Sequence, residues 1–386
     1  MEEGGDYARI SVRKRRVEVR LLTAMVSLPL CVVAFEPYLK ESLPDTVWQY
    51  FRSGADDEQT MKDNQFAFQR YRLRPRCLRD VSQRITSTSV LGHYIAFPVG
   101  VSPVAAHGFA HPDGEIATAK GVCSVGSVMI HSMWSNKRSE DVASTVQPNT
   151  PLFHQLNFLR DRSRMKEVVR KAEVAGYRAL VVTVDQPIIG NTRPAKESSL
   201  VVPSHISFPN ALRPDESFCP QTAHELFDDS ATWDTISWLK EITSLPIILK
   251  GILTAEDAKE AVKHGVAGIL VSNHGGRQLD GTLATIDALP EVVNAVRDSS
   301  VEVYLDGGVR KGTDVLKALA LGARAVFIGR PVIWGLAYDG ENGVKKVLEI
   351  LREEFSLAMA LTGCSSVDDI NPDMIVRLPH VNNELH

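Results

Sequence analysis

Eight short apolar runs rich in β-branched residues recur from about residue 95 onward, and they constrain the fold of this chain most strongly. Helical patterns such as 162–175 and 255–264 separate them, and Thr254 stands where it can cap the second of these helices. This alternation predicts an α/β fold, a closed (β/α)8 TIM barrel of parallel strands, with a doubly wound open sheet as the structural alternative. The eight runs are 95–103, 127–132, 152–158, 179–185, 246–251, 268–274, 301–308 and 325–331.

The segments around the expected barrel carry weaker patterns. An N-terminal helical segment is expected before the first strand, and a final helix at about 343–361. The long connection after strand four, at about 191–229, is rich in Pro, Ser and Asp, as a mobile lid or a surface loop would be. The expected division is an atypical N-terminal extension over 1–34, one large domain over 35–372 and a C-terminal tail over 373–386.

The first 35 residues have two interpretations. The basic cluster at 13–16 precedes an apolar run at 21–35, which is the outline of a signal peptide and shorter than a typical membrane span. The alternative is an extension whose end packs on the domain, and the intracellular character of the rest of the chain favours it. The last three residues, 384–386, do not form a peroxisomal address of the Ser-Lys-Leu type. The expected compartment is the peroxisome or the cytoplasm.

Charge and cysteine content exclude several classes of protein. The net charge is -4, so the chain lacks the basic surplus that holds proteins on nucleic acid. The five cysteines are scattered and show no Cys-x-x-Cys or Cys/His ligand spacing. A reducing compartment, with neither a zinc site nor disulfides, is therefore expected.

Ionisable residues gather at five of the predicted strand ends, the edge where barrel enzymes place their active sites. His274 beside Arg277 suits the removal of a proton from a hydroxy acid whose carboxylate the arginine holds. Asp185, at the end of the fourth strand, is expected to orient the histidine and to stabilise its cation. Lys250 ends the fifth strand. These residues form the candidate catalytic group.

Glycines and arginines follow the last two predicted strands. Gly308 and Gly329 allow backbone N–H groups to approach an anion closely, and Arg310 and Arg330 can fork onto phosphate oxygens. The pattern predicts the phosphate site that is usual in barrels. It suits either a phosphorylated substrate or the phosphate of flavin mononucleotide (FMN).

The run from Ser272 to Asp280, SNHGGRQLD, resembles the signature of the FMN-dependent 2-hydroxy-acid oxidases and dehydrogenases, the family of glycolate oxidase and lactate oxidase. The resemblance extends over about 35–372 and includes the segments 53–57, 71–76 and 305–310. It implies an FMN cofactor and the oxidation of a short (S)-2-hydroxy acid to a 2-oxo acid. With O2 as acceptor, the second product is hydrogen peroxide. A homo-oligomer is also implied.

The resemblance further implies roles for single residues. His274 is the general base, Arg277 binds the substrate carboxylate, and Lys250 lies at the N1/O2 edge of the flavin, where it stabilises the reduced ring. Tyr50 contacts the substrate, and Trp134 limits the room for its side chain, which favours an acid as short as glycolate. The positions expected to contact FMN are Pro103, Val104, Ala105, Ser132, Gln155, Thr183, Lys250, Ser272, Asp306, Gly308, Arg310, Gly329 and Arg330.

Two positions depart from the family pattern. Asn157 stands where the family has a tyrosine whose hydroxyl helps to hold the substrate, and Thr192 where it has a second carboxylate-binding arginine. Arg193 follows one place later and would bind substrate if the lid were shifted. Three functions stay open: an oxidase, a dehydrogenase that hands its electrons to another carrier, and an FMN-binding scaffold with weakened activity.

Overall fold

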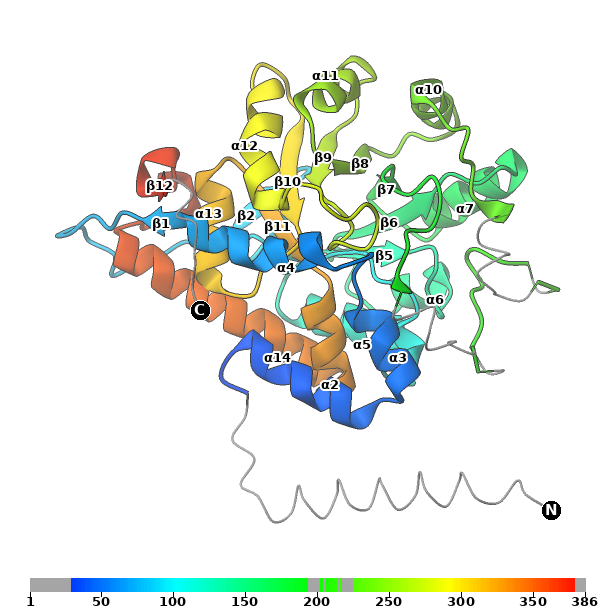
Figure 1. The fold of residues 1–386 in the computed structure, drawn as a ribbon, viewed down its shortest axis with the longest axis horizontal. Helices are drawn as coiled ribbons and strands as arrows, with labels where there is room; N and C mark the ends of the chain where they lie inside the picture. Colours follow the sequence, from blue (N-terminus) through cyan, green and yellow to red (C-terminus); the bar gives the residue numbers. More distant parts are fainter. Residues whose placement is uncertain (1–28, 194–201, 204–205, 214, 217–224, 379–386) are drawn as a thin grey trace, which may run out of the picture.

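Eight parallel strands close into a barrel in the order β10-β11-β4-β5-β6-β7-β8-β9 (Figure 1). The structure, a computed structural model, describes residues 29–193, 202–203, 206–213, 215–216 and 225–378. The closed barrel confirms the predicted fold class and excludes the open sheet, and each predicted run contains its strand to within one residue. The strands are β4 (Val99–Val101), β5 (Met129–Ser132), β6 (Leu152–Asn157), β7 (Ala179–Thr183), β8 (Ile247–Ile252), β9 (Gly268–Val271), β10 (Glu302–Asp306) and β11 (Ala325–Ile328).

The barrel interior changes from apolar to polar along the strands. Residues two apart on a strand point to the same side, so each inward apolar residue is followed by another inward residue nearer the carboxyl end. The inner apolar cluster includes Ile130, Phe153, Val181, Ile248, Leu270 and Tyr304. Two residues after each of these stand Ser132, Gln155, Thr183, Lys250, Ser272 and Asp306. The strand pattern thus places a buried polar layer at the carboxyl-terminal mouth.

Helices cover the outside of the barrel. Two predicted helices begin where expected, and the Thr254 side chain caps α11 by accepting a hydrogen bond from the backbone N–H of Asp257. The last helix bends at Asp339 and Gly340, whose backbone angles are not helical, and the helix predicted at 343–361 is its second part. The helices are α5 (Gly114–Ser124), α6 (Ser139–Ala143), α7 (Arg162–Val174), α10 (Trp233–Ile242), α11 (Ala255–Lys263), α12 (Thr285–Ala295), α13 (Gly312–Ala320) and α14 (Arg330–Thr362), with the 3-10 turn η3 (His107–Phe109) after β4.

The predicted N-terminal helical segment is present before the barrel. A hairpin follows it, and Val90 and Ile95 of this hairpin join the inner apolar cluster, so the hairpin closes the N-terminal end of the barrel. The elements are η1 (Val32–Phe35), α2 (Glu36–Ser42), α3 (Asp45–Arg52), α4 (Gln59–Phe66), η2 (Ala67–Arg70), β1 (Tyr71–Leu73), β2 (Thr88–Val90) and β3 (His93–Ile95).

Both ends of the described chain pack on the barrel domain. Val32 and Phe35 are fully buried, and the Phe35 ring meets Tyr338 of α14 edge-on at 5.2 Å. At the other end, η4 (Val367–Asp369) and η5 (Pro372–Met374) lead into β12 (Ile375–Arg377), which pairs antiparallel with β1. Packed elements therefore lie on both sides of the 35–372 range. Most of the signal-like run falls outside the described residues.

The connection between β7 and α10 is described only in part. Two of its aromatic residues, Phe208 and Phe227, are buried against Trp134, with ring centroids 6.3 and 5.7 Å away. Asn210 donates to the hydroxyl of Ser135 at 2.7 Å and to the carbonyl of Lys137 at 2.8 Å. These contacts hold the connection over the barrel next to β5. The prediction that this connection moves as a lid falls partly on residues outside the described ones.

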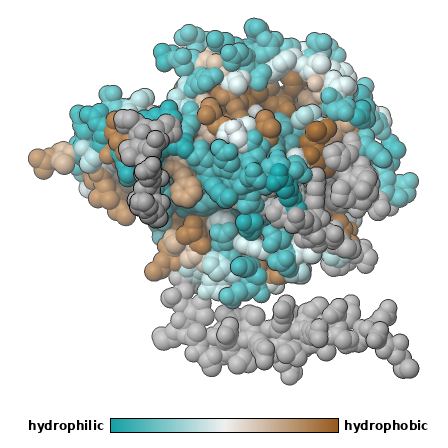
Figure 2. All heavy atoms as spheres, in the orientation of Figure 1, coloured by the Kyte–Doolittle hydropathy of each residue, from teal (hydrophilic) through white to brown (hydrophobic). Residues whose placement is uncertain are grey.

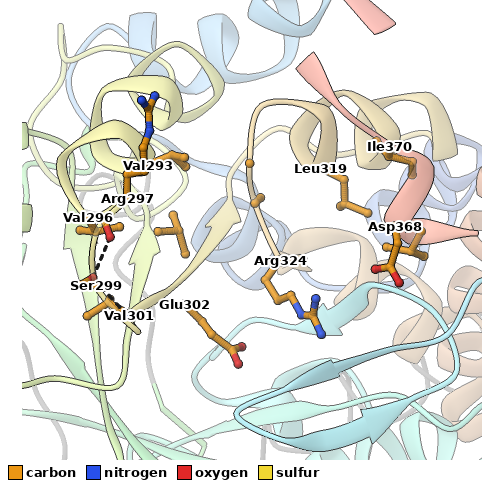
Figure 3. A pocket seen from close by; sticks show the side chains of 14 residues that line it. Val293, Val296, Arg297, Ser299, Val301, Glu302, Leu319, Arg324, Asp368 and Ile370 are labelled. Carbon is orange, nitrogen blue, oxygen red and sulfur yellow. Dashed lines mark hydrogen bonds between the residues drawn. The ribbon is translucent and has the colours of Figure 1, made fainter. Parts of the chain in front are cut away.

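Figure 2 shows hydrophilic residues over most of one face, as expected when the apolar sides of the helices face the strands. No helix within the described residues is long and apolar enough to cross a membrane. A cavity of about 430 Å³ opens at the N-terminal end of the barrel, where Val301, Glu302 and Arg324 line it (Figure 3). It lies at the opposite end from the polar layer.

Candidate active site

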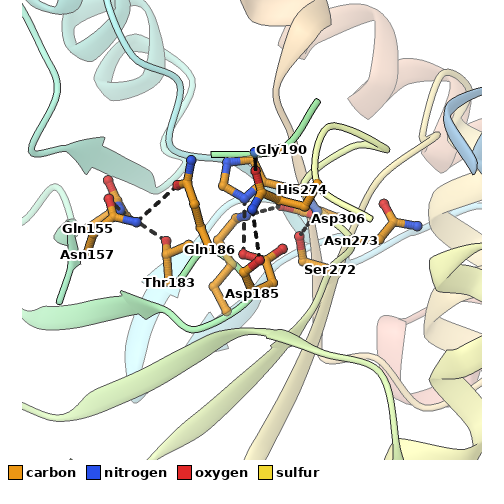
Figure 4. Close-up of polar contacts among 12 residues, drawn as sticks. Gln155, Asn157, Thr183, Asp185, Gln186, Gly190, Ser272, Asn273, His274 and Asp306 are labelled. Atoms are coloured by element: carbon orange, nitrogen blue, oxygen red, sulfur yellow. Dashed lines mark hydrogen bonds and ion pairs between the residues drawn. The ribbon is translucent and has the colours of Figure 1, made fainter. Parts of the chain in front are cut away.

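Hydrogen bonds join three side chains of the polar layer on the neighbouring strands β5, β6 and β7, two of which, Gln155 and Thr183, are labelled in Figure 4. The Ser132 hydroxyl donates to Gln155 Oε1 at 3.0 Å, and Gln155 Nε2 donates to the Thr183 hydroxyl at 3.0 Å. All three side chains are nearly fully buried. Because both ends of the Gln155 amide are bonded, its orientation is fixed. The structure thus brings together three predicted flavin-contacting residues from β5, β6 and β7.

His274 and Asp185 form the hydrogen-bonded pair that the sequence predicted. His274 Nδ1 lies 3.1 Å from Asp185 Oδ1, which leaves Nε2 of the imidazole for a substrate. Glycine at position 251 leaves room for the Asp185 side chain of this pair, because a Cβ at that position would lie 2.6 Å from the Cβ of Asp185. His274 has a φ of +59°, an unusual conformation for a residue other than glycine and one that clusters at functional sites. The hydroxyl of Ser272 supports this turn by accepting the His274 backbone N–H at 3.1 Å.

The electrostatics keep this histidine neutral near pH 7. Burial lowers the pKa of His274, the charge of Lys250 lowers it further, and Asp185 only partly offsets them. Burial raises the pKa of Asp185, but His274 in its protonated form, the charge of Lys250 and the hydrogen bond from His274 outweigh it and leave that pKa below its usual value. A neutral imidazole beside a carboxylate is a general base whose cation is stabilised once it has taken a proton.

We expect Asp185→Asn to shift the acid limb of the pH profile of kcat/KM to lower pH. Asp185 raises the pKa of His274, so its removal lowers that pKa, and the imidazole stays neutral to lower pH. The plateau should fall by about 10²-fold or more, because the imidazolium loses its stabilising charge. Initial rates across the pH range measure both effects, and an unmoved acid limb would remove Asp185 from this role.

A buried cation and anion lie beside this pair. Lys250 Nζ is 4.0 Å from Asp306 Oδ2, which also accepts a hydrogen bond from the Ser102 hydroxyl at 2.9 Å. Asp306 Oδ1 is buried and has no hydrogen-bond partner within the described residues. A buried carboxylate oxygen without a donor indicates that a ligand supplies one. The ribityl hydroxyls of a flavin are donors of this kind.

Three half-buried arginines, Arg277, Arg310 and Arg330, meet near the mouth, and in the described part of the chain none of them has a carboxylate within 4.0 Å. Arg277 donates to the carbonyls of Tyr50 and Ser53 at 2.8 and 2.9 Å. Arg330 donates to the carbonyls of Phe51, Gly275 and Ser53 at 2.9 to 3.1 Å. Burial lowers the pKa of Arg330, and the charges of Arg277 and Arg310 lower it further.

Three like charges that are partly removed from water and have no carboxylate partner are costly, so this cluster calls for an anionic ligand. The Nε of Arg310 is buried without a partner among the described residues, and its guanidinium lies 5.0 Å from the Trp334 ring. At Gly308, which has a φ of +80°, a Cβ would lie 1.8 Å from the carbonyl oxygen of Asn64 on α4. Only glycine fits there, so the backbone of this turn stays open. The residues present therefore fit the phosphate of FMN.

The β4 and β11 ends meet at the same mouth. A Cβ built at Gly329 would lie 3.5 Å from Val104, which places the predicted Pro103, Val104 and Ala105 segment next to one of the glycines that are predicted to bind phosphate. All three residues are half-buried. They stay predictions as flavin contacts.

The predicted substrate side is formed by Tyr50 and Trp134. The Arg277 guanidinium lies 5.5 Å from the Tyr50 ring, and burial raises the pKa of Tyr50, so its hydroxyl stays protonated. Trp134 is nearly buried, and its Nε1 donates to Asn157 Oδ1 at 3.1 Å. Both side chains thus have fixed positions at the mouth.

Arg193 does not take the place of the missing arginine in this structure. Its guanidinium forms ion pairs with Asp57 at 2.8 Å and Asp56 at 3.0 Å, and half of the side chain is exposed. Asn191 also donates to Asp56, at 2.6 Å. These surface carboxylates hold Arg193, so the expectation that a shifted lid turns it toward substrate is not what the structure shows.

Several residues that support the site were missed in the sequence. Ser102, which holds Asp306, follows the inward-facing Gly100 by two residues, so strand alternation could have revealed it. Asn64 and Asn273 exchange two hydrogen bonds at 2.8 and 2.9 Å and fasten α4 to the turn that carries His274. Gln186 accepts from Asn157 at 3.0 Å. No periodicity in the sequence connects Asn64 with Asn273, or Asn157 with Gln186.

Comparison with known proteins agrees with this geometry. The sequence profile described as FMN-dependent dehydrogenase matches residues 39–377. The chain belongs to the FMN-dependent dehydrogenase family. Its relatives in that family include human 2-hydroxyacid oxidase 1, which is 48% identical over 361 residues and matches across 91% of this chain and 97% of the relative.

Further members of the family are similar in sequence and in structure. The glycolate oxidase of Spinacia oleracea is 45% identical over 345 residues, covering 87% of this chain and 93% of its own length. A crystal structure of mandelate oxidase superposes with a TM-score of 0.85 at 37% identity, over 92% of this chain and all of that one. FMN is therefore the cofactor of this chain, which is an oxidoreductase that acts on CH–OH groups.

Proposed function

We propose that this chain oxidises a short (S)-2-hydroxy acid to the 2-oxo acid and passes the electrons to O2, giving hydrogen peroxide. The observation that carries the proposal is a neutral base, His274 with Asp185, at the same mouth as a half-buried arginine, Arg277, that has no carboxylate partner in the described chain. A hydroxy acid supplies the two groups that such a mouth lacks, an acidic proton and a carboxylate. The names of the relatives, 2-hydroxyacid oxidase and glycolate oxidase, support this substrate class.

Each residue then has a task in the reaction. Arg277 binds the carboxylate, and Tyr50, whose raised pKa keeps its hydroxyl protonated, donates to the bound acid. His274 takes a proton at Nε2, and Asp185 stabilises the resulting cation. Lys250, Asp306, Arg310 and Arg330 would hold FMN, which would supply the acceptor for the two electrons that leave the substrate. O2 then gains two electrons and two protons.

Trp134 favours a small substrate. The indole is fixed by its hydrogen bond to Asn157 and by the rings of Phe208 and Phe227, so it does not swing aside easily for a large side chain. Glycolate is the acid that fits this restriction best. The fixed indole of Trp134, the wall of the substrate site, therefore supports glycolate as the substrate.

The electron acceptor is tested by reoxidation. Enzyme reduced anaerobically with glycolate is mixed with buffer that contains O2, and flavin absorbance and hydrogen peroxide are followed. An oxidase regains its colour at the rate of turnover and forms one peroxide for each flavin. Slow reoxidation, with fast recovery only on adding an artificial acceptor, would indicate a dehydrogenase.

Two further proposals concern the setting of the enzyme. We infer a homo-oligomer, and light scattering of the purified protein measures its mass directly. We infer the peroxisome or the cytoplasm as its compartment, and Cys31, Cys77, Cys123 and Cys364 are free thiols, which suits either one. Imaging of the tagged full-length chain tests the compartment.

A further inference from the structure

Asn157 links three side chains at the mouth. Its Oδ1 accepts from Trp134 Nε1 and from Gln155 Nε2, both at 3.1 Å. Its Nδ2 donates to Gln186 Oε1 at 3.0 Å. The side chain is almost fully buried, so these bonds account for its polar atoms. Asn157 is thus a connector between side chains.

The orientation of Gln186 follows from this connection. The indole N–H of Trp134 can only donate, so the atom of Asn157 that faces it must be the oxygen. The nitrogen of Asn157 therefore faces Gln186 and requires the amide oxygen of that residue. The amide nitrogen of Gln186 must then point away from Asn157. It donates no hydrogen bond to any other described residue.

Gln186 stands next to the catalytic pair. It follows Asp185 in the chain and is half-buried. In Figure 4 the amide oxygen of Gln186 faces Asn157 and its amide nitrogen points away from Asn157, while the His274 imidazole is on the other side of Gln186 from Asn157. Two N–H donors are therefore presented at the mouth without a protein acceptor among the described residues.

We propose that Gln186 binds the carboxylate of the substrate through its amide nitrogen, with Asn157 as the positioning residue. The inference rests on the proposed function and adds a binding residue to it. Gln186 supplies a hydrogen-bond donor for the substrate carboxylate at a mouth where Thr192 offers no guanidinium. Arg193 cannot replace it in this structure, because it forms ion pairs with Asp56 and Asp57. Because Asn157 also fixes Trp134, one side chain sets both the new donor and the wall that favours a short acid.

Two substitutions separate substrate binding from a structural role. Gln186→Glu keeps an oxygen for Asn157 Nδ2 but turns the other atom into a negatively charged acceptor. Gln186→Met keeps the length of the side chain and removes both polar atoms. Gln147→Glu, which adds the same charge at an exposed loop residue, is the matched control.

The readout is the Kd of oxalate, measured by the change in flavin absorbance of the holoenzyme without turnover. We expect Gln186→Met to weaken oxalate binding by about tenfold and Gln186→Glu by about 100-fold, because hydrogen bonds to charged groups exceed neutral ones and like charges repel. Gln147→Glu should bind oxalate as the wild type does. Glycolate should show the same order in KM.

Other outcomes would overturn the inference. If Gln186→Glu binds oxalate as the wild type and only Gln186→Met is weakened, the residue merely supports Asn157. If Gln186→Met binds oxalate as the wild type does and only Gln186→Glu binds it more weakly, the Gln186 amide does not donate to oxalate. The weaker binding by Gln186→Glu then comes from charge repulsion alone. Wild-type flavin that no short 2-hydroxy acid reduces would instead refute the proposed function, so the two failures are distinguishable.

Discussion

His274→Gln should lower the rate of flavin reduction by about 10³-fold while the enzyme keeps its FMN, a loss within the usual range of general-base effects. The reason is local. His274 Nδ1 is engaged with Asp185, and its Nε2 is the basic atom that the mouth offers to the substrate hydroxyl or α-carbon. Lys250 and the arginines that are predicted to bind the phosphate, Arg310 and Arg330, are unchanged in this variant, so flavin content should stay near that of the wild type.

A second substitution distinguishes the loss of the base from a folding defect. His274 has a left-handed backbone, which Asn adopts more readily than Gln, so His274→Asn should preserve the turn. Both variants are mixed anaerobically with glycolate, and flavin bleaching is followed. Reduction near the wild-type rate in either variant would assign the base to another residue.

Arg277→Met should lower kcat/KM for a short 2-hydroxy acid by about 10²- to 10³-fold, since removing one partner of a buried charge pair costs 2–5 kcal/mol or more. Arg277 is half-buried and has no carboxylate within ion-pair distance in the described chain, so the substrate carboxylate is its natural partner. The loss should appear as a weaker Kd for oxalate as well as a lower rate.

Arg72→Met is the control for Arg277→Met, since Arg72 is exposed on β1 and its loss changes the net charge equally. It should leave kcat/KM unchanged. Ser53 keeps a donor in Arg277→Met because Arg330 also binds its carbonyl, so the fold should survive. If oxalate binds equally well to Arg277→Met and the wild type, another residue holds the carboxylate.

The barrel could be predicted because its strands are buried on both sides. Such strands appear as short apolar runs, and the β/α alternation gives their number. The polar layer follows from the same periodicity, since residues such as Lys250 and Asp306 stand two places after inward apolar residues. The His274–Asp185 pair was predicted from strand ends that converge at one mouth.

The remaining contacts depend on how loops fold back. Arg193 is held by Asp56 and Asp57, more than 130 residues earlier in the chain, and no periodicity connects them. The departure at Asn157 predicted only a lost tyrosine hydroxyl. The structure shows instead an amide with three partners, one of which, Gln186, carried no signal in the sequence.

The central claim is that one mouth holds FMN and delivers the electrons of a short 2-hydroxy acid to it. Anaerobic titration of the purified, yellow protein with glycolate tests this most directly. We predict one FMN for each chain, complete bleaching by one equivalent of glycolate, and one equivalent of 2-oxo acid. A protein that carries a full complement of FMN but stays yellow with glycolate, lactate and every other short 2-hydroxy acid would contradict the claim.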